Sequence, residues 1–278
     1  MAYKRILTIQ DISCLGQCSL TVALPILSAG GMETSIIPSA ILSTHTAGFK
    51  NYTFHDLTEE IPKIKDHWVA EDLKFDAIYT GYLGSTKQIN YVKDLIDSVA
   101  NKDCLNFIDP AMADHGKLYP AFDMSYVEEM KKLVEVADFT LPNLTEACFL
   151  TGIEYKEEFD KEYILSVLEK LVQSPEQTVI LTGIGYRPGK TGVVVYQNGE
   201  YDYYEHDFIT EGFHGTGDVY SSAFVAAYMN GKTAMEAAKI AADYTLACIK
   251  FTEDDRKEHW YGVKFEPMLP KLIEAINK

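Results

Sequence analysis

The most constraining feature of this sequence is its regular alternation of short apolar runs with longer segments that have the 3.6-residue period of a helix. The runs expected as strands are Arg5–Gln10, Thr34–Pro38, Asp76–Thr80, Leu105–Asp109, Phe139–Leu141 and Thr178–Thr182. The segments expected as helices are Ser19–Ala29, Leu57–Ala70, Thr86–Ala100, Ser125–Ala137, Asp160–Gln173, Thr216–Met229, Ala234–Lys250 and Glu266–Ile276. This alternation predicts an α/β fold with a mostly parallel central sheet and helices on both faces.

Two further runs depart from the alternation. Thr191–Gln197 and Glu200–Asp207 are separated only by Asn198-Gly199, a strong hairpin signal. We therefore expect an antiparallel hairpin at one edge of the sheet. No linker-like stretch and no internal repeat interrupts the 278 residues, so a single domain over residues 1–278 is predicted.

The charge balance excludes several classes of partner. Asp and Glu total 41 against 25 Lys and Arg, which gives a formal net charge of −16. Such a surface repels nucleic-acid phosphates and anionic lipids, so neither nucleic acid nor membrane is expected as a partner. The first ten residues contain too short an apolar run for a signal peptide, and the five cysteines form no CxxC pair. We expect a cytoplasmic protein.

Candidate functional side chains follow the predicted strands. In open α/β sheets, ligands bind beyond the carboxyl ends of the strands. Asp11 and Ser13 follow the first run, Asp109 begins the segment after the fourth, and Asn143 follows the fifth. Several acidic and hydroxyl side chains are therefore expected at one edge of the sheet.

The segment Gly215-Thr216-Gly217-Asp218 precedes a strongly helical stretch. Glycines allow unusual dihedral angles and close approach of a ligand, and the N–H groups of a helix N-terminus form an anion site. An Asp within an anion site fits a base for a hydroxyl nucleophile. The alternative is that Asp218 only caps the helix at a glycine-rich turn.

Five short motifs in order suggest a family. Gly215-Thr216-Gly217-Asp218 resembles the anion-hole motif of the ribokinase-like superfamily, in its vitamin-kinase branch. The others are Ser43-Thr44-His45-Thr46, Thr80-Gly81-Tyr82, Asp109-Pro110 with Asp114, and Asn143 with Glu146. Over Ile9 to about Ala227 the chain resembles the pyridoxal (pyridoxine, pyridoxamine) kinases of the PfkB/ribokinase superfamily. The resemblance implies a three-layer ribokinase-like fold.

The resemblance also implies a reaction: transfer of the ATP γ-phosphoryl group to the 5′-hydroxyl of vitamin B6, which gives the 5′-phosphate. Asp218 would take the hydroxyl proton, and Gly215, Thr216 and Gly217 would hold the phosphoryl group. The other roles that it implies are vitamin binding by Asp11, Ser13, His45, Thr46 and Tyr82, ATP binding by Asp109, Lys117, Asn143 and Thr182, and Mg²⁺ binding by Asp114 and Glu146. A monovalent cation such as K⁺ near Asp109, a phosphate flap carrying Lys117 and a homodimer are further implications.

Each assignment has a structural alternative. Asp109 and Asp114 could be turn and cap residues, and Asn143 with Glu146 has the spacing of a capping pair. His45 and Thr46 could be strand-end polar residues, and Tyr82 could pack in the core. At the level of function, the alternatives are hydroxymethylpyrimidine kinase and a non-catalytic B6-binding protein.

Three local features complete the analysis. The segment Gly183–Thr191 looks like a Walker A loop, but Ile184 stands where its first glycine belongs and a strand is expected after it. Cys14 lies near the expected vitamin pocket and could be a reactive thiol. Better-known pyridoxal kinases have Gln-Ser after the first strand, whereas here Gln10 is followed by Asp11. We therefore expect Asp11 to contact the pyridine nitrogen and Ser13 to shape the loop, with the reverse assignment as the alternative.

Overall fold

The computed structural model describes residues 3–209 and 213–278. The predicted strands and helices all lie within these described residues, while the predicted single domain also includes residues 1–2 and 210–212, which lie outside them. In the described part, nine strands form one sheet in the order β11-β10-β9-β8-β5-β4-β1-β2-β3. Their bounds are β1 Arg5–Ser13, β2 Glu33–Leu42, β3 Phe54–Asp56, β4 Phe75–Thr80, β5 Ala100–Ile108, β8 Phe139–Thr140, β9 Thr178–Thr182, β10 Lys190–Gln197 and β11 Glu200–Asp207.

The sheet is parallel in its centre and antiparallel at both edges. Strands β2, β1, β4, β5, β8 and β9 pair in parallel, whereas β3, β10 and β11 pair antiparallel to their neighbours. The β10–β11 hairpin turns at Asn198 and Gly199, whose φ angles of 53° and 78° are both positive, as a two-residue type I′ turn requires. The predicted edge hairpin is confirmed.

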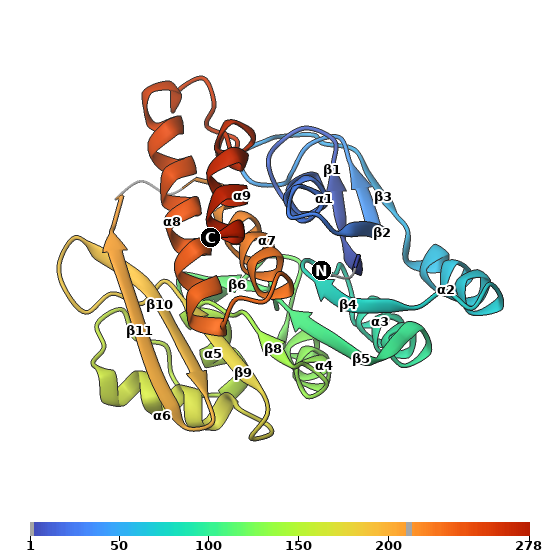
Figure 1. Ribbon diagram of the computed structural model, residues 1–278, viewed down its shortest axis with the longest axis horizontal. Helices are drawn as coiled ribbons and strands as arrows, with labels where there is room; N and C mark the ends of the chain where they lie inside the picture. The colour runs from blue at the N-terminus through green and yellow to red at the C-terminus, as the bar shows by residue number, and fades with distance from the viewer. Residues whose placement is uncertain (1–2, 210–212) are drawn as a thin grey trace.

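Helices cover both faces of the sheet (Figure 1). One layer contains α1 Leu20–Ala29, α7 Thr216–Met229, α8 Ala234–Thr252 and α9 Leu269–Asn277. The other contains α2 Ile61–Ala70, α3 Thr86–Val99, α4 Met124–Val134, α5 Leu144–Thr151 and α6 Lys161–Leu171. The three-layer α/β fold expected from the sequence is therefore present. No helix in residues 3–209 and 213–278 is long and apolar enough to cross a bilayer.

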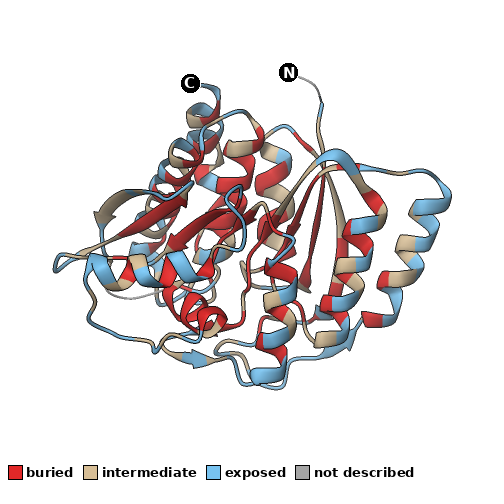
Figure 2. Ribbon diagram, turned by 90° about the horizontal axis from the view of Figure 1, so that it is seen from below, coloured by how far each residue is buried: buried red, intermediate tan, exposed pale blue. Residues whose placement is uncertain are grey.

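Two hydrophobic cores lie on the two faces of the sheet. Successive strand residues point to opposite faces, so Ile6 packs in the core under α1 and α7, and Leu7 packs in the core under α2 to α6. Figure 2 shows buried residues along the central strands and on the inner faces of the helices, with exposed residues on the outer faces. The rigid sheet between these cores fixes the positions of the loops at its carboxyl edge.

Several expected boundaries were wrong. The expected helix Leu57–Ala70 is a short 3₁₀ turn, Thr58–Glu60, followed by α2, and the last expected helix likewise begins with a 3₁₀ turn, Glu266–Met268. Helix α5, strand β3 and the hairpin of β6 (Ala113–Asp114) and β7 (Lys117–Leu118) were not expected. Strand β5 begins at Ala100, which the sequence pattern placed at the end of a helix.

Candidate active site

The candidate residues gather at the carboxyl edge of the sheet, near the point where the strand order reverses. The chain passes from β1 to β2 on one side and later returns to β4 on the other side of β1. Asp11 lies at the carboxyl end of β1, and Gly81 follows β4. A Cβ on Gly81 would lie 2.7 Å from Cδ of Gln10, so any larger residue there would have to displace this buried side chain. Such a reversal of strand order marks the usual ligand position in doubly wound sheets.

The N-terminus of α7 faces this edge. Gly215 is the N-cap with φ 75°, and a Cβ on it would lie 1.7 Å from the carbonyl oxygen of Gln17. Gly217 differs, because a Cβ there would meet no atom of the described residues within 4 Å outside its own helix and its chain neighbours. The first-turn N–H groups of a helix have no partner within the helix, and the helix dipole favours an anion beside them. The protein packing therefore explains the glycine at 215, while the glycine at 217 leaves space for a ligand.

Asp218 lies in the first turn of α7 and is partly buried. Burial raises the pKa of its carboxyl group to about 7, and the nearby Asp109 and Asp11 raise it further, against the lowering effect of the Ser19 N–H group. A carboxylate with a pKa near neutrality is suited to take a proton from an alcohol. The alternative that Asp218 is the N-cap is wrong, because Gly215 is the N-cap of α7 and Asp218 lies three residues further along the chain.

Asp109 connects the end of β5 to α7. Its carboxylate accepts a hydrogen bond from Ser221 Oγ at 2.8 Å and from the Ala111 N–H group at 3.2 Å. Asp109 is buried, and burial raises its pKa. Ser221 lies one helical turn beyond Asp218, so the two carboxylates lie against the same face of α7.

Asn143 and Glu146 form a complete capping box at the start of α5, so the capping interpretation is confirmed. Glu146 Oε2 accepts from the Asn143 N–H group, and Oε1 accepts from the N–H groups of Met112 at 2.9 Å and Ala113 at 3.5 Å. Burial and the charge of Asp109 raise the pKa of Glu146. Glu146 thus fixes the segment that leads from Asp109 to the β6–β7 hairpin.

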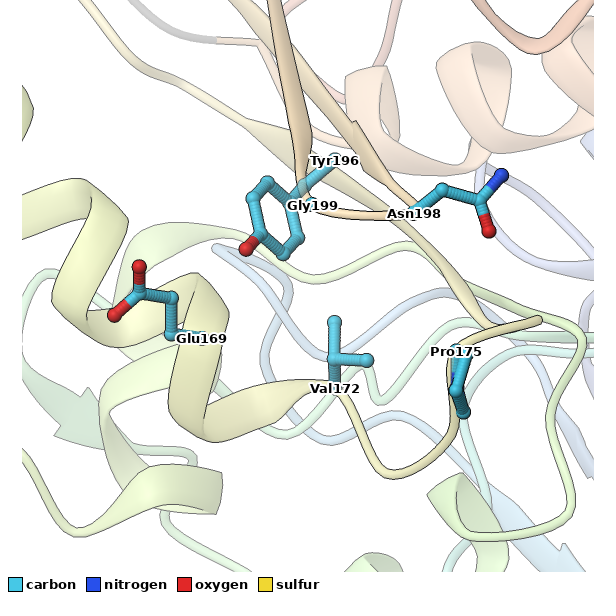
Figure 3. Close-up of a pocket in the computed structure, with 6 residues that line it drawn as sticks. All are labelled: Glu169, Val172, Pro175, Tyr196, Asn198 and Gly199. Carbon is cyan, nitrogen blue, oxygen red and sulfur yellow. The ribbon is translucent and has the colours of Figure 1, made fainter.

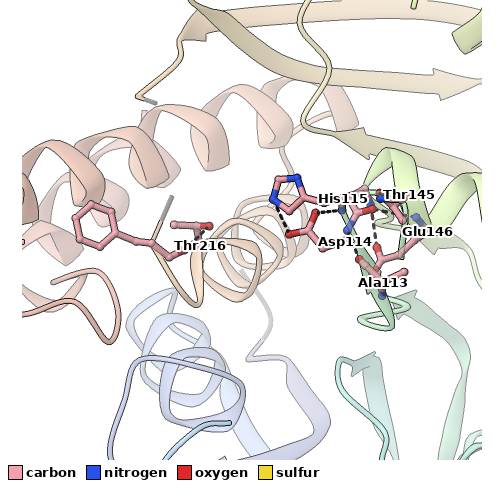
Figure 4. A network of polar contacts seen from close by, with 9 residues as sticks. Ala113, Asp114, His115, Thr145, Glu146 and Thr216 are labelled. Atoms are coloured by element: carbon pink, nitrogen blue, oxygen red, sulfur yellow. Dashed lines mark hydrogen bonds and ion pairs between the residues drawn. The ribbon is translucent and has the colours of Figure 1, made fainter. Parts of the chain in front are cut away.

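Asp114 and Lys117 lie opposite each other in that hairpin. The segment was expected to be a loop, and it is instead a two-stranded hairpin with φ angles of 49° at His115 and 72° at Gly116 in its turn. The Asp114 carboxylate is exposed and accepts from the His115 N–H group at 2.8 Å (Figure 4). A positive and a negative side chain therefore project from one short, exposed hairpin.

The two acids expected to hold Mg²⁺ lie in different environments. Glu146 is buried with three backbone donors on its carboxylate, whereas Asp114 is exposed. Within the described residues, no group of three or more His, Cys, Asp or Glu side chains gathers as a metal site. Mg²⁺ commonly takes one or two carboxylates, several waters and substrate phosphates, and this pair of acids is compatible with such a site.

Asp11 and Ser13 lie side by side near the carboxyl end of β1. The Ser13 hydroxyl donates to Asp11 Oδ2 at 3.2 Å. Asp11 is buried, and burial raises its pKa, while hydrogen bonds from Ser19 and Ser13 lower it. The serine therefore supports the carboxylate in this structure.

The other three residues expected at the vitamin site differ in exposure. His45 is buried, its Nε2 lies 2.8 Å from the Tyr261 carbonyl oxygen, and its Nδ1 accepts from the Ala47 N–H group. Thr46 is exposed. Tyr82 is half-buried, packs on Phe122 with a ring distance of 5.4 Å, and has a pKa raised to about 12, mainly by burial and also by the charge of Asp11.

Asn143 and Thr182 come together at the ends of β8 and β9. They form an isolated bridge, in which the Thr182 N–H group donates to the Pro142 carbonyl oxygen at 3.0 Å. The Walker-like segment beside them leads into β10, as expected, and Lys190 pairs with Asp207 at 2.7 Å. This lysine therefore has a carboxylate partner within the hairpin.

Sequence reasoning missed three residues at this edge. Ser221 supports Asp109, and Ser19 donates to Asp218 and Asp11. The pKa of Tyr119 is raised by burial and by four carboxylates around it, those of Glu146, Asp114, Asp109 and Asp218. Polar residues in the otherwise apolar start of α7 were the available signal for Ser221, whereas Ser19 and Tyr119 required the fold.

Two hollows on the described surface lie elsewhere. One of about 340 Å³ opens beside the β10–β11 turn and the segment that precedes β9, at the amino edge of the parallel strands (Figure 3). Its lining residues are Glu169, Val172, Pro175, Tyr196, Asn198 and Gly199. None of them belongs to the predicted site, so this hollow gives no support to a second active site.

The sequence comparison decides the family. The sequence profile described as phosphomethylpyrimidine kinase matches residues 27–263, which is most of the chain. The chain belongs to this kinase family. The same family includes pyridoxal kinases of the PfkB/ribokinase type, and its members are phosphotransferases.

Similar proteins fall into two substrate groups. A Bacteroides thetaiotaomicron protein assigned to the phosphomethylpyrimidine kinases, crystallised with pyridoxal, is 36% identical, with a TM-score of 0.90 over 98% of this chain and 96% of that chain. A pyridoxal kinase from Lactobacillus plantarum is 28% identical, with a TM-score of 0.91 over 98% of each chain. A Bacillus subtilis hydroxymethylpyrimidine/phosphomethylpyrimidine kinase is 28% identical over 77% of each chain. These relatives support a kinase for a small heteroaromatic alcohol.

Proposed function

We propose that this protein transfers the γ-phosphoryl group of ATP to the 5′-hydroxyl of a B6 vitamer, as a pyridoxal kinase. The observation that carries the proposal is Asp218, a partly buried acid with a pKa raised to about 7 in the first turn of α7. Similarity over almost the whole chain to a protein crystallised with pyridoxal supports this choice of acceptor.

In the proposed reaction, Asp218 accepts the proton of the 5′-hydroxyl as its oxygen attacks the γ-phosphorus, and ADP leaves. The N–H groups of Gly215, Thr216 and Gly217 hold the transferring phosphoryl group at the positive end of the helix dipole. Phosphoryl transfer requires mainly positioning and neutralisation of charge, which these groups supply.

Asp114 and Glu146 are the two acids proposed to hold Mg²⁺. The exposed carboxylate of Asp114 would bind it directly, and the remaining lone pair of Glu146 would reach it through water. Such an ion neutralises charge on the phosphates when it is bound. Asp109, Lys117, Asn143 and Thr182 are proposed to contact ATP, and a monovalent cation beside Asp109 stays a prediction.

The acceptor is proposed to lie between β1, β4 and the β2–β3 loop. Asp11 would face the pyridine nitrogen with Ser13 supporting it, since the Ser13 hydroxyl already donates to Asp11. His45, Thr46 and Tyr82 would form the remaining wall. A homodimer, a single domain over residues 1–278 and a cytoplasmic location belong to this proposal as well.

The test is a coupled ADP-release assay with pyridoxal, pyridoxine and pyridoxamine, with hydroxymethylpyrimidine and ribose as comparison substrates. Replacing Asp218 with Asn is expected to lower kcat by roughly 10²–10⁴-fold, the contribution of a positioned base, with little change in ATP affinity. A variant that turns over at nearly the wild-type rate would remove Asp218 from the mechanism. Pyridoxal binding without turnover in the wild-type protein would favour the non-catalytic B6-binding alternative.

Hydroxymethylpyrimidine kinase is the second candidate. The family description and the similarity to the Bacillus subtilis enzyme favour it. The two functions differ in the acceptor ring, so the ratio of kcat/KM for pyridoxal and hydroxymethylpyrimidine decides between them. A higher value for hydroxymethylpyrimidine would replace the first proposal.

A further inference from the structure

The segment from Arg256 to Gly262, here called the C-terminal strap, crosses the loops on the acceptor side of the candidate site. It follows α8 and the short 3₁₀ turn after that helix, and it has no regular secondary structure. None of the motifs that pointed to a kinase includes it. Its contacts nevertheless reach three of the loops that carry candidate residues.

The strap contacts the β1–α1 loop at Gln17. His259 Nε2 lies 3.1 Å from Gln17 Oε1, and because an amide oxygen only accepts, the ring nitrogen donates this bond. A Cβ on Gly262 would lie 2.7 Å from Cβ of Gln17. The other side of the Gln17 backbone packs on Gly215, where a Cβ would lie 1.7 Å from the Gln17 carbonyl oxygen. Gln17 is thus held between the strap and the N-cap of α7.

The strap also fixes His45 in the loop after β2. Because the Ala47 N–H group donates to Nδ1, the proton of the neutral ring lies on Nε2, which donates to the Tyr261 carbonyl oxygen at 2.8 Å. Both ring nitrogens are therefore engaged by backbone. A ligand could therefore contact only the faces of the His45 ring and its C–H groups.

Trp260 packs on the same loop. Its ring lies 4.6 Å from the Phe49 ring and 6.4 Å from the His45 ring, and a Cβ on Gly48 would lie 2.6 Å from it. At the entry to α7, the guanidinium of Arg256 lies 4.1 Å from the centre of the Phe213 ring. Each of these contacts joins the strap to a loop that leads to a residue expected to bind the acceptor or the phosphoryl group.

We propose that the C-terminal strap is a positioning element of the acceptor pocket, which sets affinity for the heteroaromatic alcohol by holding His45 and the β2–β3 loop in place. This inference rests on the proposed function, because it assigns the strap to the same acceptor site. With both nitrogens engaged, His45 contributes a fixed aromatic wall. A flat ring packed against such a wall is favoured over a sugar, because aromatic pairs contribute beyond simple area burial.

The experiment compares Trp260→Ala with Trp260→Phe, using titration calorimetry for pyridoxal and for a non-hydrolysable ATP analogue. Trp260 is 39% exposed, so its truncation is expected to leave the protein folded. The Ala variant should weaken pyridoxal binding about 3- to 10-fold, as expected for a lost aromatic contact, with nucleotide binding changed less than about twofold. The Phe variant should restore most of the pyridoxal affinity. Phe251→Ala, at the end of α8 and 46% exposed, is the matched control and should change neither constant.

A second strap variant and a turnover assay complete the experiment. His259→Leu removes the hydrogen bond between the strap and Gln17, and it should produce the same selective loss of pyridoxal affinity even if Trp260→Ala does not fold. Unchanged pyridoxal affinity, or equal weakening of both ligands, in folded strap variants would overturn the proposal. Wild-type turnover tests the proposed function separately: a protein that binds pyridoxal but phosphorylates only hydroxymethylpyrimidine would overturn that function, while the titrations still decide the role of the strap.

Discussion

The pKa of Asp218 predicts that the proposed base destabilises the fold when it is ionised. We expect Asp218→Asn to stabilise the protein at alkaline pH while it removes activity, the trade-off found at many active sites. Burial raises the pKa of Asp218 from 3.8 to about 7. At about 1.4 kcal/mol per pKa unit, this shift sets an upper limit of about 4 kcal/mol. Because the side chain is only partly buried, water screens part of this cost, and the expected gain is about 1–3 kcal/mol.

The gain has a defined pH dependence. Between the unfolded pKa near 3.8 and the folded pKa near 7, the folded protein keeps a proton that the unfolded chain has lost. The wild-type free energy of unfolding therefore falls as pH rises through this window. Asn cannot ionise, so the difference between variant and wild type should be near zero below about pH 4, grow up to about pH 7 and stay constant above it.

Urea unfolding of both proteins, followed by circular dichroism at about pH 5 and about pH 8, measures this difference. Asp103→Asn, at an exposed position of β5, is the matched control and should show no such growth. A difference that is equal at the two pH values would refute the argument that burial of this charge raises its pKa. A variant less stable than the wild type at about pH 8 would refute it as well.

Three further expectations follow from the site. Asp11→Asn should raise KM for pyridoxal selectively, most at low pH where the pyridinium is populated, and a larger selective loss in Ser13→Ala would reverse their assigned roles. Lys190→Ala should change KM for ATP modestly and leave kcat largely intact, because its segment leads into a strand; complete loss of turnover in a folded variant would contradict this. Gly215→Ala should lower the thermal midpoint far more than Gly199→Ala. Both glycines have positive φ angles, but only at position 215 would the added Cβ clash with backbone, at 1.7 Å from the Gln17 carbonyl oxygen. Equal effects would show that the loop shifts to make room for the Cβ.

Much of the fold could be predicted because it depends on local periodicity. The amphipathic stripe of α3 and the Asn198-Gly199 turn are encoded by neighbouring residues, so they could be recognised without any partner. Helix α5 was missed for the opposite reason. Seven of its eight residues are buried, including polar Thr145 and Glu146, so it has no exposed face to give a helical period.

The candidate site could be predicted as a set of residues but not as an arrangement. Asp218 and its glycines were found because they are consecutive. The hydrogen bond between Asp109 and Ser221 joins positions 112 residues apart, and no spacing rule indicates it. The pairing of β5 with β4 likewise extends β5 back through exposed polar residues that have no strand pattern.

The sequence by itself determined the layered α/β architecture, the edge hairpin and the types of side chain available for catalysis, because these depend on residue identity over a few turns or strand residues. Only the tertiary structure decided how the acidic residues of the site differ in exposure, hydrogen bonding and pKa. Asp114 is exposed in a hairpin, Glu146 is buried and accepts three backbone hydrogen bonds, and Asp218 has a pKa raised to about 7 by burial and by the carboxylates of Asp109 and Asp11. Protonation and metal affinity depend on burial and on neighbouring charges, and chain segments distant in sequence supply both.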